Sequence, residues 1–84
     1  MILEIYNKNT GINPVFVRAN TELLRSFKEQ LDQLLTVEER KTALEKLWTT
    51  QYSARLVKST DGLYWSNIEF LDQKSAMLFS LRWY

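Results

Sequence analysis

The sequence predicts an α+β domain in which an antiparallel sheet is covered on one face by helices. Three observations support this class. Strand-like segments lie toward both ends of the chain, amphipathic helical segments occupy its middle, and the turn Asp61-Gly62 separates two strand-like runs. The expected order of elements is ββααββα, with ββααβββ as the alternative. The 84 residues are expected to form a single domain, 1–84.

The first expected unit is a β-hairpin at the beginning of the chain. Residues 2–6 alternate in the manner of a strand, and residues 7–11, Asn-Lys-Asn-Thr-Gly, have the composition of a turn. Pro14 then opens a second strand over residues 15–18, because its missing N–H is tolerated at a strand start. Strand, short polar loop and strand together predict the hairpin.

Two amphipathic helices are expected next. Apolar residues recur at helical spacing between about residues 21 and 35, where Asn20 or Thr21 is the expected cap. The apolar stripe consists of Leu23, Leu24, Phe27, Leu31 and Leu34. Thr36 and Glu39 match a capping box, so a second helix is expected to start at Thr36. One long bent helix is the alternative.

The second half of the chain predicts another hairpin and a terminal element. Residues 52–58 and 63–71 are expected strands around the turn at 59–62. After them, Asp72 can cap a helix through residues 73–84 that buries one apolar stripe. The same segment also alternates in the manner of a strand, which leaves the strand as the alternative.

The composition excludes several kinds of chemistry. The chain has no His and no Cys, so imidazole and thiolate catalysis, disulfides and Cys/His zinc sites are excluded. With two glycines, a glycine-rich phosphate loop cannot be built, and no serine-nucleophile motif occurs. We therefore expect no enzyme, no cofactor and no metal. A small-ligand or oxygen-ligated metal site between sheet and helices is a third hypothesis.

A candidate binding face follows from the expected strands. If Leu3, Ile5, Val15 and Val17 face the core, other side chains of these strands face away. The candidate partner-binding residues are Tyr6, Phe16, Arg18, Arg55 and Trp65. Tyr, Trp and Arg dominate protein-protein hot spots, and aromatics interleaved with Arg also suit single-stranded nucleic acid. A protein partner is the first expectation and single-stranded nucleic acid the alternative, while the face could instead be covered by a helix or a second subunit.

Charge, composition and size give expectations about the partners, location and oligomeric state of the protein. Eleven Lys and Arg against ten Asp and Glu give a net charge of +1, which disfavours nonspecific phosphate binding. The chain lacks a membrane-length apolar run and a signal-like start, and without Cys it fits the cytoplasm. Small domains without disulfides or metals are often stabilised by dimerisation, so a homodimer is a further expectation.

The segment from Ile68 to Trp83, Ile-Glu-Phe-Leu-Asp-Gln-Lys-Ser-Ala-Met-Leu-Phe-Ser-Leu-Arg-Trp, resembles the end of small uncharacterised tailed-bacteriophage proteins. The shared features are an apolar strand, an acidic break and an Ala-x-x-Phe-x-Leu-x-Trp segment. Ser75 stands where an acidic residue is more typical of those proteins. The resemblance implies a phage accessory protein or inhibitor that binds a host protein in the host cytoplasm, and it implies no catalytic residues.

Overall fold

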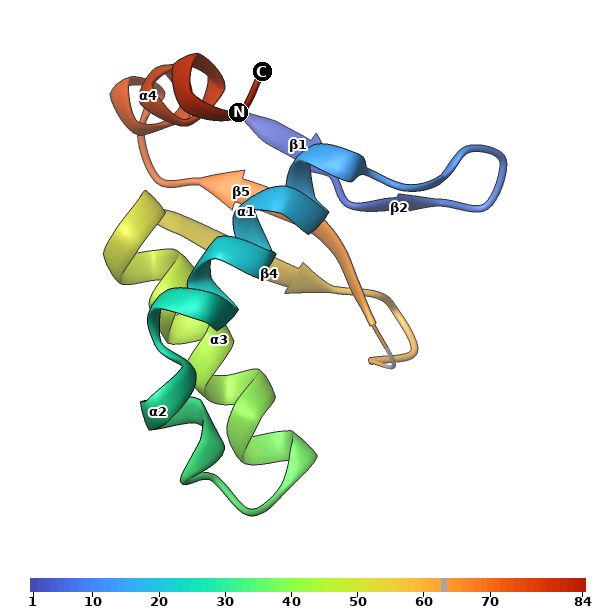
Figure 1. Cartoon of the computed structure of the whole chain (residues 1–84). Coiled ribbons are helices and arrows are strands. Elements are labelled where there is room, and N and C mark those ends of the chain that lie inside the picture. The colour runs from blue at the N-terminus through green and yellow to red at the C-terminus, as the bar shows by residue number, and fades with distance from the viewer. Residues whose placement is uncertain (63) are drawn as a thin grey trace.

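The structure is a computed structural model that describes residues 1–62 and 64–84 (Figure 1). Its strands are β1 (Ile2–Glu4), β2 (Tyr6–Asn7), β3 (Gly11–Ile12), β4 (Ala54–Lys58) and β5 (Trp65–Phe70). Its helices are α1 (Pro14–Ser26), α2 (Lys28–Asp32), α3 (Val37–Tyr52) and α4 (Gln73–Trp83). The predicted α+β class is confirmed.

The main sheet has three antiparallel strands in the order β1-β5-β4. One row across it places Leu3 beside Ile68 and Ile68 beside Leu56, and the next row joins Ile2, Glu69 and Arg55. Because side chains alternate between faces, the first row lies on the core side and the second on the solvent side. The apolar residues of α1, α3 and α4 share one core with the first row, so helices cover one face of the sheet.

Aromatic side chains dominate the centre of this core. Trp48 of α3 is fully buried, and its ring stacks on Phe16 of α1 at 5.4 Å between centroids. The Trp48 Nε1–H donates a 3.0 Å hydrogen bond to the Asn20 side-chain oxygen. Tyr52 and Phe79 also contact the Trp48 ring, with centroids 4.9 and 5.8 Å away. This cluster joins α1, α3 and α4 above the sheet.

The predicted strand over residues 15–18 is wrong, because these residues form the first turns of α1. Asn13 caps this helix by accepting a 2.9 Å hydrogen bond from the Val15 N–H. Pro14 occupies the first helical position, where a missing N–H costs nothing. The partner of β2 is instead the short β3, reached through the predicted turn. The expected caps Asn20 and Thr21 both lie inside α1 and do not cap it.

The predicted break between two helices occurs, with one further interruption. At Phe27 the backbone leaves helical geometry, with φ of −116° and ψ of 25°, so the stretch expected at 21–35 divides into α1 and α2. Thr36 caps α3 by accepting a 3.1 Å hydrogen bond from the Glu39 N–H, as the capping box predicts. The Glu39 carboxylate accepts from Leu35 N–H at 3.3 Å instead of from the cap residue.

The second predicted hairpin is confirmed with shorter strands. Tyr52 still belongs to α3, and Ser53 takes a left-handed conformation, φ 50°, that ends the helix before β4 begins. The turn residue Gly62 has φ of +73°, which glycine adopts without strain. Leu63, the expected first residue of the longer strand, lies outside the described residues.

The terminal element is the helix α4, as the capping argument predicts, and the strand alternative is wrong. The Asp72 carboxylate accepts a 2.7 Å hydrogen bond from the Ser75 N–H and caps the helix. Ala76 and Phe79 are buried and Trp83 packs against the same core. The hydrogen bond from Ser75, with a smaller contribution from nearby Lys74, lowers the pKa of Asp72 from its ordinary value of 3.8.

The Asp72 cap gives a pH dependence that can be measured. A carboxylate whose pKa is lower in the folded state stabilises the fold above its unfolded pKa, and the contribution disappears as the pH falls through the folded pKa. Asparagine caps a helix nearly as well without titrating. In melting curves at several pH values, the advantage of the wild type over Asp72→Asn is therefore expected to shrink below about pH 4. A pH-independent difference would contradict this role.

Candidate docking groove

The structure does not bring the five sequence-predicted site residues onto one face. Phe16 lies on the buried side of α1, only 5% exposed, which contradicts its expected outward position. Arg18 is on α1 and its guanidinium donates to the Trp83 backbone oxygen at 3.1 Å. Arg55 lies on the open face of the sheet and pairs with Glu69 at 3.0 Å. Tyr6 is exposed on β2, where its ring makes an edge contact with Tyr64 at 5.5 Å.

Trp65 lies on the helix side of the sheet because of a β-bulge. Asn67 pairs with Val57 but Trp65 pairs with Lys58, so Ser66 is an extra residue in β5. The bulge reverses the alternation that the sequence predicts. The Trp65 indole N–H consequently donates to the Glu45 carboxylate of α3 at 3.1 Å, and its ring contacts Phe16. Trp65 is therefore half-buried and holds β5 against α3.

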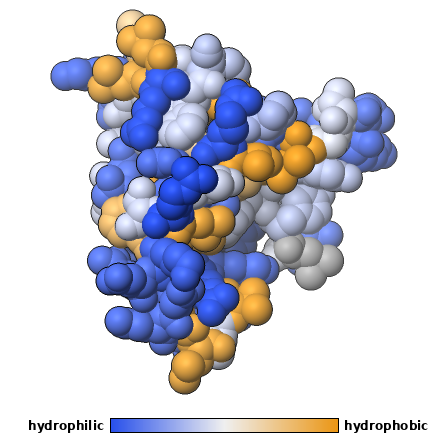
Figure 2. Space-filling view, viewed as in Figure 1, coloured by the Kyte–Doolittle hydropathy of each residue, from blue (hydrophilic) through white to orange (hydrophobic). Residues whose placement is uncertain are grey.

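Several exposed apolar side chains lie on α4 and its neighbours. Since Ala76 and Phe79 point to the core, the outer face of α4 carries large apolar side chains that are 57–82% exposed. They are Met77, Leu78 and Leu81, and Leu71 and Met1 lie beside them, 60% and 64% exposed. Figure 2 shows hydrophobic residues, in orange, over α4. Exposed patches of this kind mark interaction sites on soluble proteins.

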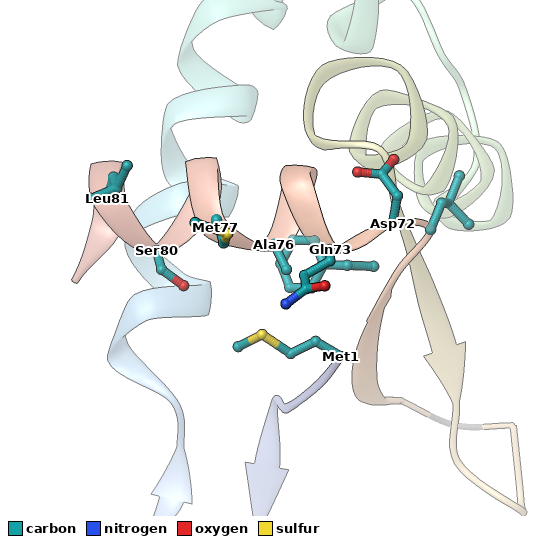
Figure 3. Close-up of a pocket in the computed structure, with 9 residues that line it drawn as sticks. Met1, Asp72, Gln73, Ala76, Met77, Ser80 and Leu81 are labelled. Carbon is teal, nitrogen blue, oxygen red and sulfur yellow. The ribbon is translucent and has the colours of Figure 1, made fainter.

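Four of these residues, Met1, Leu71, Met77 and Leu81, line an open groove of about 710 Å³, which we call the α4 groove. Leu78 borders a separate hollow. A hydrogen bond from Phe70 N–H to the Met1 carbonyl oxygen, 3.0 Å, fixes Met1 across from the helix. Figure 3 shows Met1 facing α4, with Gln73 and Ser80 pointing into the space between them. The full lining is Met1, Phe70, Leu71, Asp72, Gln73, Ala76, Met77, Ser80 and Leu81.

The chemistry of the α4 groove suits binding. Its one side-chain carboxylate, Asp72, is engaged as the helix cap, and its other polar side chains are Gln73 and Ser80. Methionine side chains are flexible and polarisable and adapt to varied apolar partners. The groove therefore offers an adaptable apolar floor with a few hydrogen-bonding groups at its edge.

The sequence did contain a signal for this groove. Residues 77–83 fit strand alternation as well as helical spacing because apolar side chains occur on more than one side of the helix. One set, Ala76, Phe79 and Trp83, packs inward, and the surplus set, Met77, Leu78 and Leu81, faces outward. A surplus of apolar residues on a terminal helix indicates a second contact surface.

Comparison of the chain with protein-family models, with curated proteins and with solved structures finds no match. Among the described residues, no three acidic side chains converge where a metal ion could be held. No helix in the described part of the chain combines the length and the apolar character needed to cross a membrane.

Proposed function

We propose that this protein is a non-enzymatic protein-binding module whose α4 groove receives apolar side chains of a partner protein. The observation that carries the proposal is the exposure of Met77 and Leu81, at 59% and 82%, in a groove beside a helix whose opposite side is already buried. Apolar area of this kind gains about 25 cal/mol per Å² when a partner removes it from water.

Two features of the structure, one in the α4 groove and one on the main sheet, favour a protein over single-stranded nucleic acid. The lining of the groove contains no Lys or Arg to contact phosphates. The aromatic residues of the main sheet, Trp65 and Phe70, lie on the helix side, so the open face lacks the stacking platform that nucleic acid requires.

The resemblance to phage proteins extends this proposal. Residues 68–83, which carry the resemblance, supply most of the lining of the α4 groove. In a phage accessory protein or inhibitor acting in the host cytoplasm, the same groove would cover part of a host protein's surface. Specificity would then come from the shape of the groove together with Gln73 and Ser80 at its edge.

The α4 groove can be tested with two matched leucines. Leu81 in the groove is 82% exposed and Leu35, in the α2–α3 loop, is 92% exposed, so aspartate is expected to be tolerated structurally at both. The chain has no Cys, so a Lys8→Cys variant allows attachment through the β2–β3 loop. Immobilised protein is mixed with host lysate, and bound proteins are quantified by mass spectrometry.

The expected result is one partner retained by the parent protein and by Leu35→Asp but lost with Leu81→Asp. Direct binding of the purified partner is then measured with the same variants by calorimetry. A partner that binds Leu81→Asp as well as the parent contradicts the proposal. Sedimentation of the parent and of Leu81→Asp distinguishes a different partner protein from a second copy of this chain. If the parent self-associates and Leu81→Asp does not, the second copy occupies the groove.

A further inference from the structure

A second hollow, away from the α4 groove, lies where the end of α1 and α2 run beside the first half of α3 (Figure 1). Its volume is about 450 Å³. The buried residues Leu31 and Leu44 lie at its floor, and Leu24 beside them is 41% exposed. The remaining lining residues are Thr21, Arg25, Lys28, Asp32 and Arg40. We call this region the cationic hollow.

The charges around the cationic hollow are unbalanced, although those of the whole chain nearly cancel. Three cationic side chains, Arg25, Lys28 and Arg40, line the hollow against the single carboxylate of Asp32. That carboxylate is already paired with Lys28 at 3.0 Å. Two guanidinium groups therefore stand beside exposed leucine with no carboxylate of the lining left to balance them.

The pairing of the five arginines singles out the same two residues. Arg18 donates to a backbone oxygen at the end of α4, Arg55 pairs with Glu69, and Arg82 lies 4.0 Å from Glu22. Within the described residues, Arg25 and Arg40 make no ion pair or side-chain hydrogen bond. The two unpaired arginines are thus the two that line this hollow.

We propose that the cationic hollow is a docking site for an acidic segment of a partner protein that also carries an apolar side chain. The apolar side chain would rest on Leu24, Leu31 and Leu44. Glu or Asp side chains of the segment would pair with Arg25 and Arg40, since the planar guanidinium binds a carboxylate through two parallel hydrogen bonds. Arginine beside apolar surface is also a typical composition of protein-protein interfaces. This inference does not depend on the α4 groove.

The inference is tested with three short synthetic peptides of equal length. The first alternates Glu and Leu, the second replaces each Glu by Lys, and the third replaces each Leu by Ser. Each is titrated into ¹⁵N-labelled protein while amide chemical shifts are followed. The first peptide is expected to bind most tightly, to shift the amides around Arg25, Leu31 and Arg40, and to lose affinity as salt is added.

Charge reversal provides the matched variants. The double variant Arg25→Glu and Arg40→Glu is expected to bind the Glu-Leu peptide about tenfold more weakly than the wild type. Lys46→Glu, an exposed α3 position outside the hollow, is expected to leave the affinity nearly unchanged. Unaltered amide shifts elsewhere in the spectrum establish that the double variant remains folded.

Three outcomes would overturn the proposal. The first is equal binding of the Lys-Leu peptide, which removes the role of charge. The second is the absence of shifts around the hollow at millimolar Glu-Leu peptide. The third is that a short oligothymidylate binds at Arg25 and Arg40 more tightly than the Glu-Leu peptide does. That result would make the hollow a phosphate-binding surface.

Discussion

Replacing Trp48 by alanine is expected to lower the free energy of unfolding by about 3–5 kcal/mol. The side chain is fully buried, so the substitution removes a large apolar surface from the core and leaves a cavity between α1, α3 and α4. It also removes the indole donor to Asn20. A domain of 84 residues has a free energy of unfolding of about 4–13 kcal/mol. The substitution is therefore expected to remove a large part of it.

The measurement for Trp48 is urea denaturation followed by far-ultraviolet circular dichroism. Trp48→Phe is the control, because it keeps an aromatic ring stacked on Phe16 while removing the hydrogen bond to Asn20. Its effect is expected to be well below that of Trp48→Ala. Near-equal midpoints for the wild type and Trp48→Ala would contradict the central position of Trp48 in the core.

Replacing Phe16 by alanine is expected to destabilise the protein by about 3–5 kcal/mol as well. The reason is again burial, since Phe16 is 5% exposed and its ring contacts both Trp48 and Trp65. A large loss of stability is not expected from the strand hypothesis, in which Phe16 is a candidate partner-binding residue on an exposed strand face.

The neighbouring Val17 is the control for Phe16. It is 41% exposed, so Val17→Ala is expected to change the free energy of unfolding by no more than about 1 kcal/mol. Both variants are compared by urea denaturation under the same conditions. A Phe16→Ala variant that unfolds at the wild-type midpoint would restore the strand interpretation of residues 15–18.

Features that depend on local chemistry could be predicted from the sequence. The caps Thr36 and Asp72 act within three residues of their partners, and the turn at Asp61-Gly62 requires only the conformational freedom of its own residues. These signals located α3, α4 and the β4–β5 hairpin. Two helices and one antiparallel hairpin were enough to predict the α+β class.

Features that depend on distant partners could not be predicted in the same way. The run Val15 to Arg18 is too short to distinguish a period of 2 from a helical period, and Pro14 is accepted at the start of either element. The neighbouring core decides between them by burying Val15, Phe16 and Ala19 together. Phe16 and Arg18 were assigned to a strand face for this reason.

The bulge at Ser66 explains the other misplaced residue of the candidate site. A single extra residue in a strand makes all residues beyond it point to the opposite face of the sheet. The residue types from Trp65 to Asn67 do not predict this bulge. Trp65 was consequently expected on the open face of the sheet. Arg55, on the regular side of the bulge, does lie on that open face.

The backbone hydrogen bond between Phe70 and Met1 has a practical consequence for reagents made from this protein. Met1 and the last turns of α4 border the same groove, so the two ends of the chain emerge beside it (Figure 1). A purification tag or fluorescent fusion joined at either end would therefore compete with a binding partner for space. The loop between β2 and β3 projects from the far side of the molecule and leaves the groove unobstructed when a label is placed there.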